Sequence, residues 1–530
     1  MSRMIRRLMA GFAMHLGVAA LFCANGTAAF GSGEPQESFL YQNFVRASEV
    51  LDRAVTAHGG LELLDRARDI RVSLTGTYHY EGHGDRPWAY RDYKLKGDWI
   101  YSAALGAVKS EATLEYDKPQ PSFAIVGPAN GIEVGAGDTK PDSIPAPKLG
   151  DRLREEFEFL PQEFLRQARD RAASLRLLSG AKGYDVVHYS LENGEGRALF
   201  FDSKNHLLMR VERIDHWEIK GDRLEWRTFA EYADHDGIRV PRRSEAHKEE
   251  FSTQNNVITE IVKIEFDAPV KAEEFTIPAA FRAGFEAWAL QSPTAKPDEL
   301  LPFHDLGKNV YIIDMPPSDS RALLVGFTDY SVVVEAGDRS ELGDRLLRTA
   351  AHVMPDKPVR YVAMTHHHPL YANAIRPYVQ RGVKVLVTEG NVSYTRDLAT
   401  RPYRFHPDEQ QRHPKEPVFE VIKGKRIIED GGQRLEFHQF DYSTHTLEYV
   451  LPYLASHKLI VTGDMVYILR GAEPGPASSR ERALQRVITE RGLDVETIMQ
   501  TWFLQRADQL TPYSLLEEKI RLAEAKDAKK

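Results

Sequence analysis

The chain has 530 residues, of which 42% are hydrophobic and 28% are charged, and its formal charge at pH 7 is −8. This length exceeds that of one ordinary domain, so we expect two or three domains in a soluble, globular protein. The mild excess of acidic residues argues against nucleic acid or an anionic membrane surface as the main partner.

Residues 1–32 have the layout of a secretory signal peptide. Arginines stand at positions 3, 6 and 7, an apolar run extends from Leu8 to about Ala24, and small residues follow at 27–29. The apolar run is too short for a comfortable membrane span. We therefore expect cleavage, a periplasmic or secreted protein, and no integral membrane span in the mature chain. An uncleaved membrane anchor is the alternative.

The only cysteine of the chain, Cys23, lies inside this segment. Lipoprotein signals usually carry a small residue directly before the cysteine, whereas Phe22 stands here, so lipidation is disfavoured. Cleavage after Ala29 leaves no cysteine, which excludes disulfides and suits an exported chain that is stabilised by core burial. Cleavage also removes three arginines and no acids, which changes the formal charge from −8 to −11.

Residues 35–292 are predicted to form an antiparallel, β-rich domain that begins with helices. Apolar positions recur at helical spacing within residues 38–66, where Gly59 and Gly60 interrupt the helix. Period-two alternation over successive strands is typical of an antiparallel sheet with one packed face. The pattern predicts strands at 70–78, 185–190, 207–213 and 258–266, a Gly/Pro-rich loop at 127–150, and a helical stretch at 151–178.

Three turn-and-strand phrases give this half a resemblance to periplasmic lipoprotein-carrier and sorting proteins. They are Leu199-Phe-Phe-Asp-Ser203 with His206-Leu-Leu208, the turn and strand from Tyr232 to Pro241, and Phe275-Thr-Ile-Pro278. The resemblance implies a curved half-barrel that could hold an acyl chain or another hydrophobic ligand. A structural or docking role for the sheet is the alternative.

Residues 300–530 are predicted to form a second, layered α/β domain after a linker at 293–302. Strands are expected at 309–313, 321–325 and 330–335, and a helix at 341–352 leads into the strand that ends at 365. Further strands are expected at 384–388, 435–440, 447–451 and 459–462, and helices at 480–491 and 515–525. Strands that alternate with helices in this way are typical of α/β layers.

Three consecutive histidines follow the strand at 362–365. Because side chains alternate along an extended segment, His366 and His368 point to the same side, and His367 points the other way. Neutral imidazole is the commonest metal ligand, so this pair is predicted to share one metal ion.

Three motifs in order give this half a resemblance to the metallo-β-lactamase superfamily. Thr365-His-His-His368 is similar to the start of the family's T-H-x-H-x-D-H run, Ser443-Thr-His-Thr446 to its G-H-T turn, and Val461-Thr-Gly-Asp464 to the G-D that closes a strand. The resemblance implies an αβ/βα sandwich with its site along one edge of the two sheets. It also implies that His445 is the third histidine ligand and that Asp464 is the bridging carboxylate.

Three histidines with one open position describe a hydrolytic zinc site. Zinc lowers the pKa of a bound water to about 7 and so supplies hydroxide at neutral pH. Asp464 is expected to ligate the metal, or to orient and deprotonate the water as the catalytic carboxylate. A solvated histidine cluster without metal is the alternative.

The chain departs from the family pattern at the second metal position. The family's Asp and His would fall at Leu370 and Tyr371, and its last histidine would fall near Trp502. Leucine and tryptophan cannot coordinate zinc, and neutral tyrosine is a poor ligand. The sequence therefore predicts one zinc ion or none, and leaves Tyr371 either to donate a hydrogen bond to a substrate or to pack beside its apolar neighbours.

Two functions follow from these patterns. The first is an exported hydrolase with a single zinc site that cleaves an ester, lactone, amide or related bond of a small-molecule or lipid-like substrate. The second is a non-catalytic binding or assembly protein built on a degenerate hydrolase domain. His406 and His413, in the polar loop at 401–417, are weaker site candidates, and Glu335 is expected to support the end of its strand.

Overall fold

The computed structural model describes residues 38–66, 68–81, 83–116, 119–135, 142–144, 149–217, 221–248, 257–279, 299–502, 504 and 506–529. The predicted signal peptide and most of the predicted linker at 293–302 lie outside these ranges. Among the helices that can be described, none is both long and apolar enough to cross a membrane.

The first half is dominated by one large sheet, in which the described strands pair antiparallel in the order β6-β5-β4-β3-β2-β1-β13-β12-β11-β10-β9-β8-β7. The predicted antiparallel sheet is therefore confirmed. Its strands are β1 Asp69–Glu81, β2 Tyr90–Ser102, β3 Ala107–Glu115, β4 Pro119–Val126, β5 Gly131–Val134, β6 Asp142–Ser143, β7 Arg176–Leu178, β8 Tyr184–Ser190, β9 Gly196–Asp202, β10 Leu208–Trp217, β11 Gly221–His235, β12 Ile238–Lys248 and β13 Val257–Phe266.

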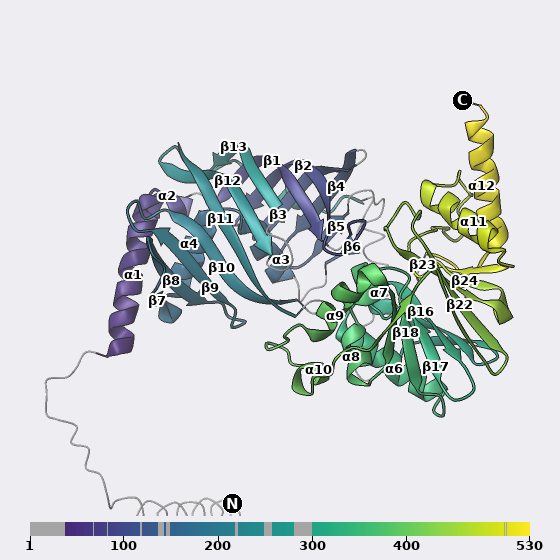
Figure 1. The fold of residues 1–530 in the computed structure, drawn as a ribbon. Coiled ribbons are helices and arrows are strands. Elements are labelled where there is room, and N and C mark those ends of the chain that lie inside the picture. The colour runs from purple at the N-terminus through teal and green to yellow at the C-terminus, as the bar shows by residue number, and fades with distance from the viewer. Residues whose placement is uncertain are drawn as a thin grey trace, which may run out of the picture.

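Within the described residues, the α-helices that accompany this sheet are α1 Phe39–Ala57, α2 Leu61–Arg66, α3 Leu149–Phe157 and α4 Pro161–Asp170. Apolar side chains of α1 and α4 share one core with β8–β11, and those of α3 share another with β1–β4. The sheet curves around these helices (Figure 1). The single helical stretch predicted at 151–178 is too long. Proline favours the first turn of a helix, and Pro161 starts a new helix, α4. The last three residues of the predicted stretch form the strand β7.

The buried side chain of His58, at the end of α1, makes the folding stability of the first half depend on pH. Its Nδ1 donates to the Ala54 carbonyl at 2.8 Å and its Nε2 accepts from the Leu208 amide at 3.3 Å, so the neutral ring is fully used. Burial lowers the pKa of His58 to about 4. An unfolded chain binds a proton here below about pH 6.5 and the folded chain does not, so stability falls as the pH drops from 6.5 towards 4.

We expect His58 to contribute a loss of roughly 3 kcal/mol across that pH window. Urea unfolding measured at several pH values should show a His58→Asn variant that is less stable at pH 7.5 but has a flatter acid limb. His413, which is exposed, provides the control, since His413→Asn should keep the parent profile. An unchanged acid limb in His58→Asn would contradict this assignment.

The second half contains two mixed sheets that pack face to face. In the described part of the chain the strand orders are β14-β15-β16-β17-β18-β19-β20 and β21-β22-β23-β24-β25-β26. The strands are β14 Phe303–Gly307, β15 Val310–Met315, β16 Ser320–Gly326, β17 Ser331–Val334, β18 Val359–Ala363, β19 Lys384–Thr388, β20 Phe419–Ile422, β21 Lys425–Asp430, β22 Gln433–Phe440, β23 Tyr449–Leu454, β24 Leu459–Val461, β25 Thr497–Met499 and β26 Thr511–Pro512.

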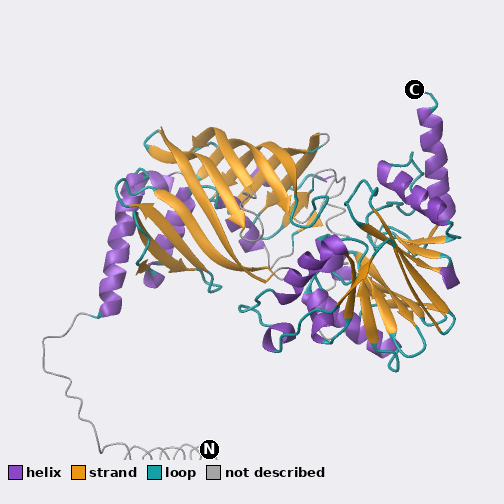
Figure 2. Ribbon diagram, viewed as in Figure 1, coloured by secondary structure: helices purple, strands orange, loops and turns teal. Residues whose placement is uncertain are grey.

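Helices cover both outer faces of this pair of sheets (Figure 2). One apolar core lies between the two sheets, a second joins the first sheet to α6, α8 and α9, and a third joins the other sheet to α11 and α12. The helices are α6 Ser340–Val353, α7 Pro369–Ala372, α8 Ile375–Gln380, α9 Val392–Thr400, α10 Glu409–Arg412, α11 Ser479–Arg491 and α12 Tyr513–Asp527. This layering is consistent with the predicted αβ/βα sandwich.

Candidate metal centre

Three loops of the layered half bring four predicted residues into one group. His366 and His368 lie between β18 and α7, His445 lies between β22 and β23, and Asp464 follows β24. Their ligand atoms all lie within 4.8 Å of one another. The side chains are buried, with exposed fractions between 1% and 9%. The structure therefore brings together the four residues that the sequence analysis named as candidate metal ligands.

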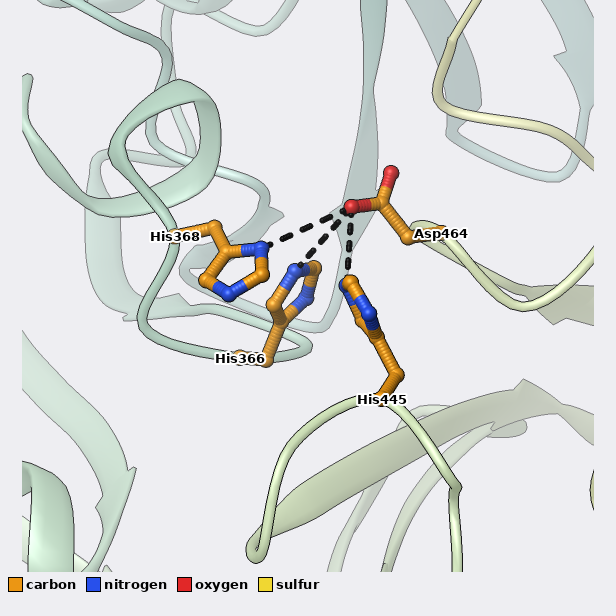
Figure 3. A group of neighbouring side chains, drawn as sticks. All are labelled: His366, His368, His445 and Asp464. Carbon is orange, nitrogen blue, oxygen red and sulfur yellow. Dashed lines mark hydrogen bonds and ion pairs between the residues drawn. The ribbon is translucent and has the colours of Figure 1, made fainter. Parts of the chain in front are cut away.

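One carboxylate oxygen is the centre of the group (Figure 3). Oδ2 of Asp464 lies 3.4 Å from His366 Nε2, 3.7 Å from His368 Nδ1 and 3.0 Å from His445 Nε2. His366 Nε2 and His368 Nδ1 are buried and make no hydrogen bond. Unpaired buried nitrogens that converge on a carboxylate are costly unless a cation joins them, so this donor set fits a metal ion.

The ring nitrogens of His366 and His368 that do not face Asp464 each lie within hydrogen-bond distance of another polar group. Thr365 Oγ1 lies 3.0 Å from His366 Nδ1, and the Gly84 carbonyl lies 3.1 Å from His368 Nε2. A carbonyl can only accept, so His368 Nε2 donates to it, and Nδ1 is the ring nitrogen that faces Asp464. Such outer partners fix the ring orientation of metal-ligating histidines.

The protonation states of the group also suit a divalent cation. Burial, reinforced by His368, lowers the pKa of His366 well below its usual value, and burial lowers the pKa of His445 to about 4. Burial raises the pKa of Asp464, but the three imidazoles more than offset this and hold it well below its usual range. These shifts favour neutral imidazoles at His366 and His445 and an ionised carboxylate at Asp464 at neutral pH, which are the forms that bind metal.

Two tyrosine hydroxyls occupy the other oxygen of the carboxylate. Tyr371 donates to Asp464 Oδ1 at 2.5 Å and Tyr467 donates to the same oxygen at 2.9 Å. Burial raises the pKa of Tyr371 well above its usual value, so its hydroxyl stays protonated and can only donate to the ionised carboxylate. The structure therefore gives Tyr371 a partner that neither alternative from the sequence had named, the Asp464 carboxylate.

Glu335 lies beneath the group, as expected for a residue that supports its strand end. Its φ is 76°, which strains a residue with a side chain, and its Oε2 accepts from the Thr365 amide at 3.3 Å. Burial raises the pKa of Glu335 to about 8, so the carboxyl is uncharged at neutral pH. Glu335 thus fixes the start of the histidine loop without adding charge to the group.

The weaker sequence candidates lie elsewhere. His406 is packed edge-on against His216 of the large sheet, with ring centroids 4.6 Å apart, and His413 is exposed beside Glu409. Trp502 pairs with Ser320 in an isolated bridge. Within the described ranges, none of these residues belongs to the four-residue group.

Sequence reasoning missed Tyr467 and the contribution of Gly84. Tyr467 stands three positions after Asp464 in the same turn, so its position was a usable signal. The Gly84 contact is made by a backbone carbonyl of the first half, which leaves no signature in the side-chain sequence.

Comparison with known proteins finds similarity only among solved structures. No protein-family model matches the chain, and no curated protein matches it. A metallo-beta-lactamase from Pontibacter korlensis is 20% identical over 42% of this chain and 99% of its own, with a TM-score of 0.32. The metallo-beta-lactamase FIM-1 from Pseudomonas aeruginosa, in its mono-zinc form, is 15% identical over 44% of this chain and 98% of its own, with a TM-score of 0.30.

A further match is a double mutant of the sec-alkyl sulfatase PisA1, which is 15% identical over 41% of this chain and 41% of its own, with a TM-score of 0.30. All three TM-scores lie below 0.5. The layers and the metal centre therefore rest on the strand order and the side-chain contacts described above.

Proposed function

We propose that this protein is an exported hydrolase with a single zinc ion, held by His366, His368 and His445, with Asp464 beside the position left open for a water. The observation that carries the proposal is the convergence of three buried imidazoles on Asp464 Oδ2, together with the two hydroxyls that donate to Oδ1. Zinc would supply a Lewis acid that lowers the pKa of a water at its open position to about 7.

The residues of the chain have distinct roles in this proposal. The three histidines would bind the zinc ion, and the buried Asp464 carboxylate would neutralise part of its charge. Oδ2 of Asp464 is the ionised proton acceptor among the three imidazoles, where it would orient an attacking water. Tyr371 and Tyr467 hold Oδ1 and so keep the carboxylate from reaching a second metal ion.

The proposed substrate is a small molecule or lipid-like compound with an ester, lactone, amide or related bond. The acidic composition disfavours nucleic acid as a partner. The N-terminal 32 residues support export to the periplasm or beyond, since they have the charge and apolar pattern of a signal peptide.

The test is metal analysis of the full chain purified without an affinity tag. We expect about one zinc ion per chain and hydrolysis of chromogenic esters. A chelator should remove both the zinc and the hydrolytic activity, and added zinc should restore both. His366→Ala should lose the metal, whereas the exposed His413→Ala should keep it. A folded chain that takes up no zinc would refute the metal-centred proposal.

A second candidate, a non-catalytic protein with a structural metal, is favoured by the burial of the group. All four side chains are at most 9% exposed, and closed four-ligand zinc sites are structural. One bound zinc without turnover of any ester, lactone or amide probe would support this candidate over the hydrolase.

A further inference from the structure

The turn between β1 and β2 of the large sheet lies against the metal centre of the other half. The described part of this turn begins at His83, whose ring centroid is 5.0 Å from that of His368 and 4.2 Å from that of Tyr80, on which it stacks. The first half of the chain thus reaches the group that the second half supplies.

Two consecutive carbonyls of this turn bind two different ligand loops. The Gly84 carbonyl accepts from His368 Nε2 at 3.1 Å, and the Asp85 carbonyl accepts from the Leu447 amide at 2.7 Å. Leu447 is two residues after His445. The turn therefore joins the histidine loop after β18 to the loop before β23.

The rest of the turn is anchored beside His367, the middle histidine of the run. The Trp88 ring meets Tyr394 edge-on at 4.8 Å, and Tyr394 lies edge-on to His367 at 5.9 Å. Tyr394 belongs to α9, so these contacts hold the turn against that helix.

We propose that the β1–β2 turn is part of the metal centre, with the Gly84 carbonyl as a positioning group that presents His368 Nδ1 to the metal. The Asp85 carbonyl holds the loop that carries His445 through its hydrogen bond from the Leu447 amide. This inference rests on the metal-binding part of the proposed function and is independent of hydrolysis. It makes the large sheet a working component of the site rather than a separate docking domain.

The sequence of the turn suits this role. Gly84 is buried, and a Cβ added to it would lie 2.5 Å from both Cβ and the carbonyl oxygen of Ala89. A side chain at this position must therefore displace the backbone and with it the carbonyl. Gly84→Val should move the acceptor away from His368 while leaving every ligand side chain in place.

A second contact between the two halves provides a matched control. The Asp222 carboxylate, at the start of β11, accepts from the Arg404 amide at 2.6 Å and from the Phe405 amide at 3.1 Å. Asp222→Ala loosens the same pair of halves without touching the loops that carry the ligands. The comparison separates a specific effect on the metal centre from a general loss of contact.

The experiment measures the zinc dissociation constant of the full-length chain by competition with a chelator. We expect Gly84→Val to weaken zinc binding by about 10- to 100-fold, the range found when outer-shell partners of metal ligands are removed. Asp222→Ala should change it by less than about threefold. Equal weakening in both variants, or none in Gly84→Val, would overturn the proposal.

Nitrogen NMR of the unsubstituted, metal-free chain tests the same contact without changing Gly84. The His368 ring, assigned by its loss in His368→Gln, should show the tautomer protonated on Nε2, with a slowly exchanging proton. A ring whose Nε2 carries no proton, or exchanges it rapidly with solvent, would sink the inference. If the parent chain binds no zinc but shows this tautomer, the metal proposal fails and the positioning contact stands.

Discussion

Asp464→Asn is expected to weaken zinc binding by roughly 100-fold or more and to remove most of any hydrolytic turnover. The substitution keeps the shape of the side chain but removes the negative charge at the centre of the group. Oδ2 of Asp464 lies within 3.0 to 3.7 Å of three imidazole nitrogens, and no other carboxylate of the described chain joins that group. The three imidazoles alone would then have to hold a dication in a buried site.

Glu335→Gln is the matched control for this prediction, since it also replaces a buried carboxyl by its amide. Burial raises the pKa of Glu335 to about 8, so at pH 7 that substitution removes no charge. Chelator competition at pH 7 should therefore give a large loss for Asp464→Asn and a small one for Glu335→Gln. If the two variants lose affinity equally, the charge of Asp464 is not what binds the metal.

The sequence was sufficient to predict which four side chains form the group. His366 and His368 are two positions apart after a buried strand, so extended geometry alone places them on one side. His445 and Asp464 came from motif order, since nothing local indicates that loops 80 to 100 residues further along the chain return to the same edge. Their meeting point depends on the packing of two sheets, which is a property of the whole layered half.

What the sequence could not predict depends on backbone atoms and on contacts between the halves. Gly84 contributes a carbonyl, and any residue type has one. The role of Tyr371 also depended on where Asp464 lies, because the same phenol could have packed beside apolar neighbours. The polar loop at 401–417 was expected near the site, but its Arg404 and Phe405 amides bind Asp222 of the large sheet instead.

Tyr371→Phe is expected to weaken zinc binding by about 10-fold or more, without raising the zinc content above about one ion per chain. The Tyr371 hydroxyl is fully buried and donates to Asp464 Oδ1 at 2.5 Å, so its removal leaves a charged oxygen short of a donor that water cannot readily replace. The carboxylate is then free to turn, and Oδ2 loses its fixed position among the histidines.

Tyr467→Phe removes the other donor to the same oxygen and provides the comparison. Tyr467 is 38% exposed, so water can take the place of its hydroxyl at Oδ1, and we expect a smaller loss of affinity than for Tyr371→Phe. Zinc titration with metal analysis measures both affinity and stoichiometry. A second zinc bound by Tyr371→Phe would mean that the buried hydroxyl, rather than the missing ligands at positions 370 and 502, is what keeps this centre at one metal. Equal losses in the two variants would mean that burial of the donor does not matter and that only the number of hydrogen bonds to Oδ1 does.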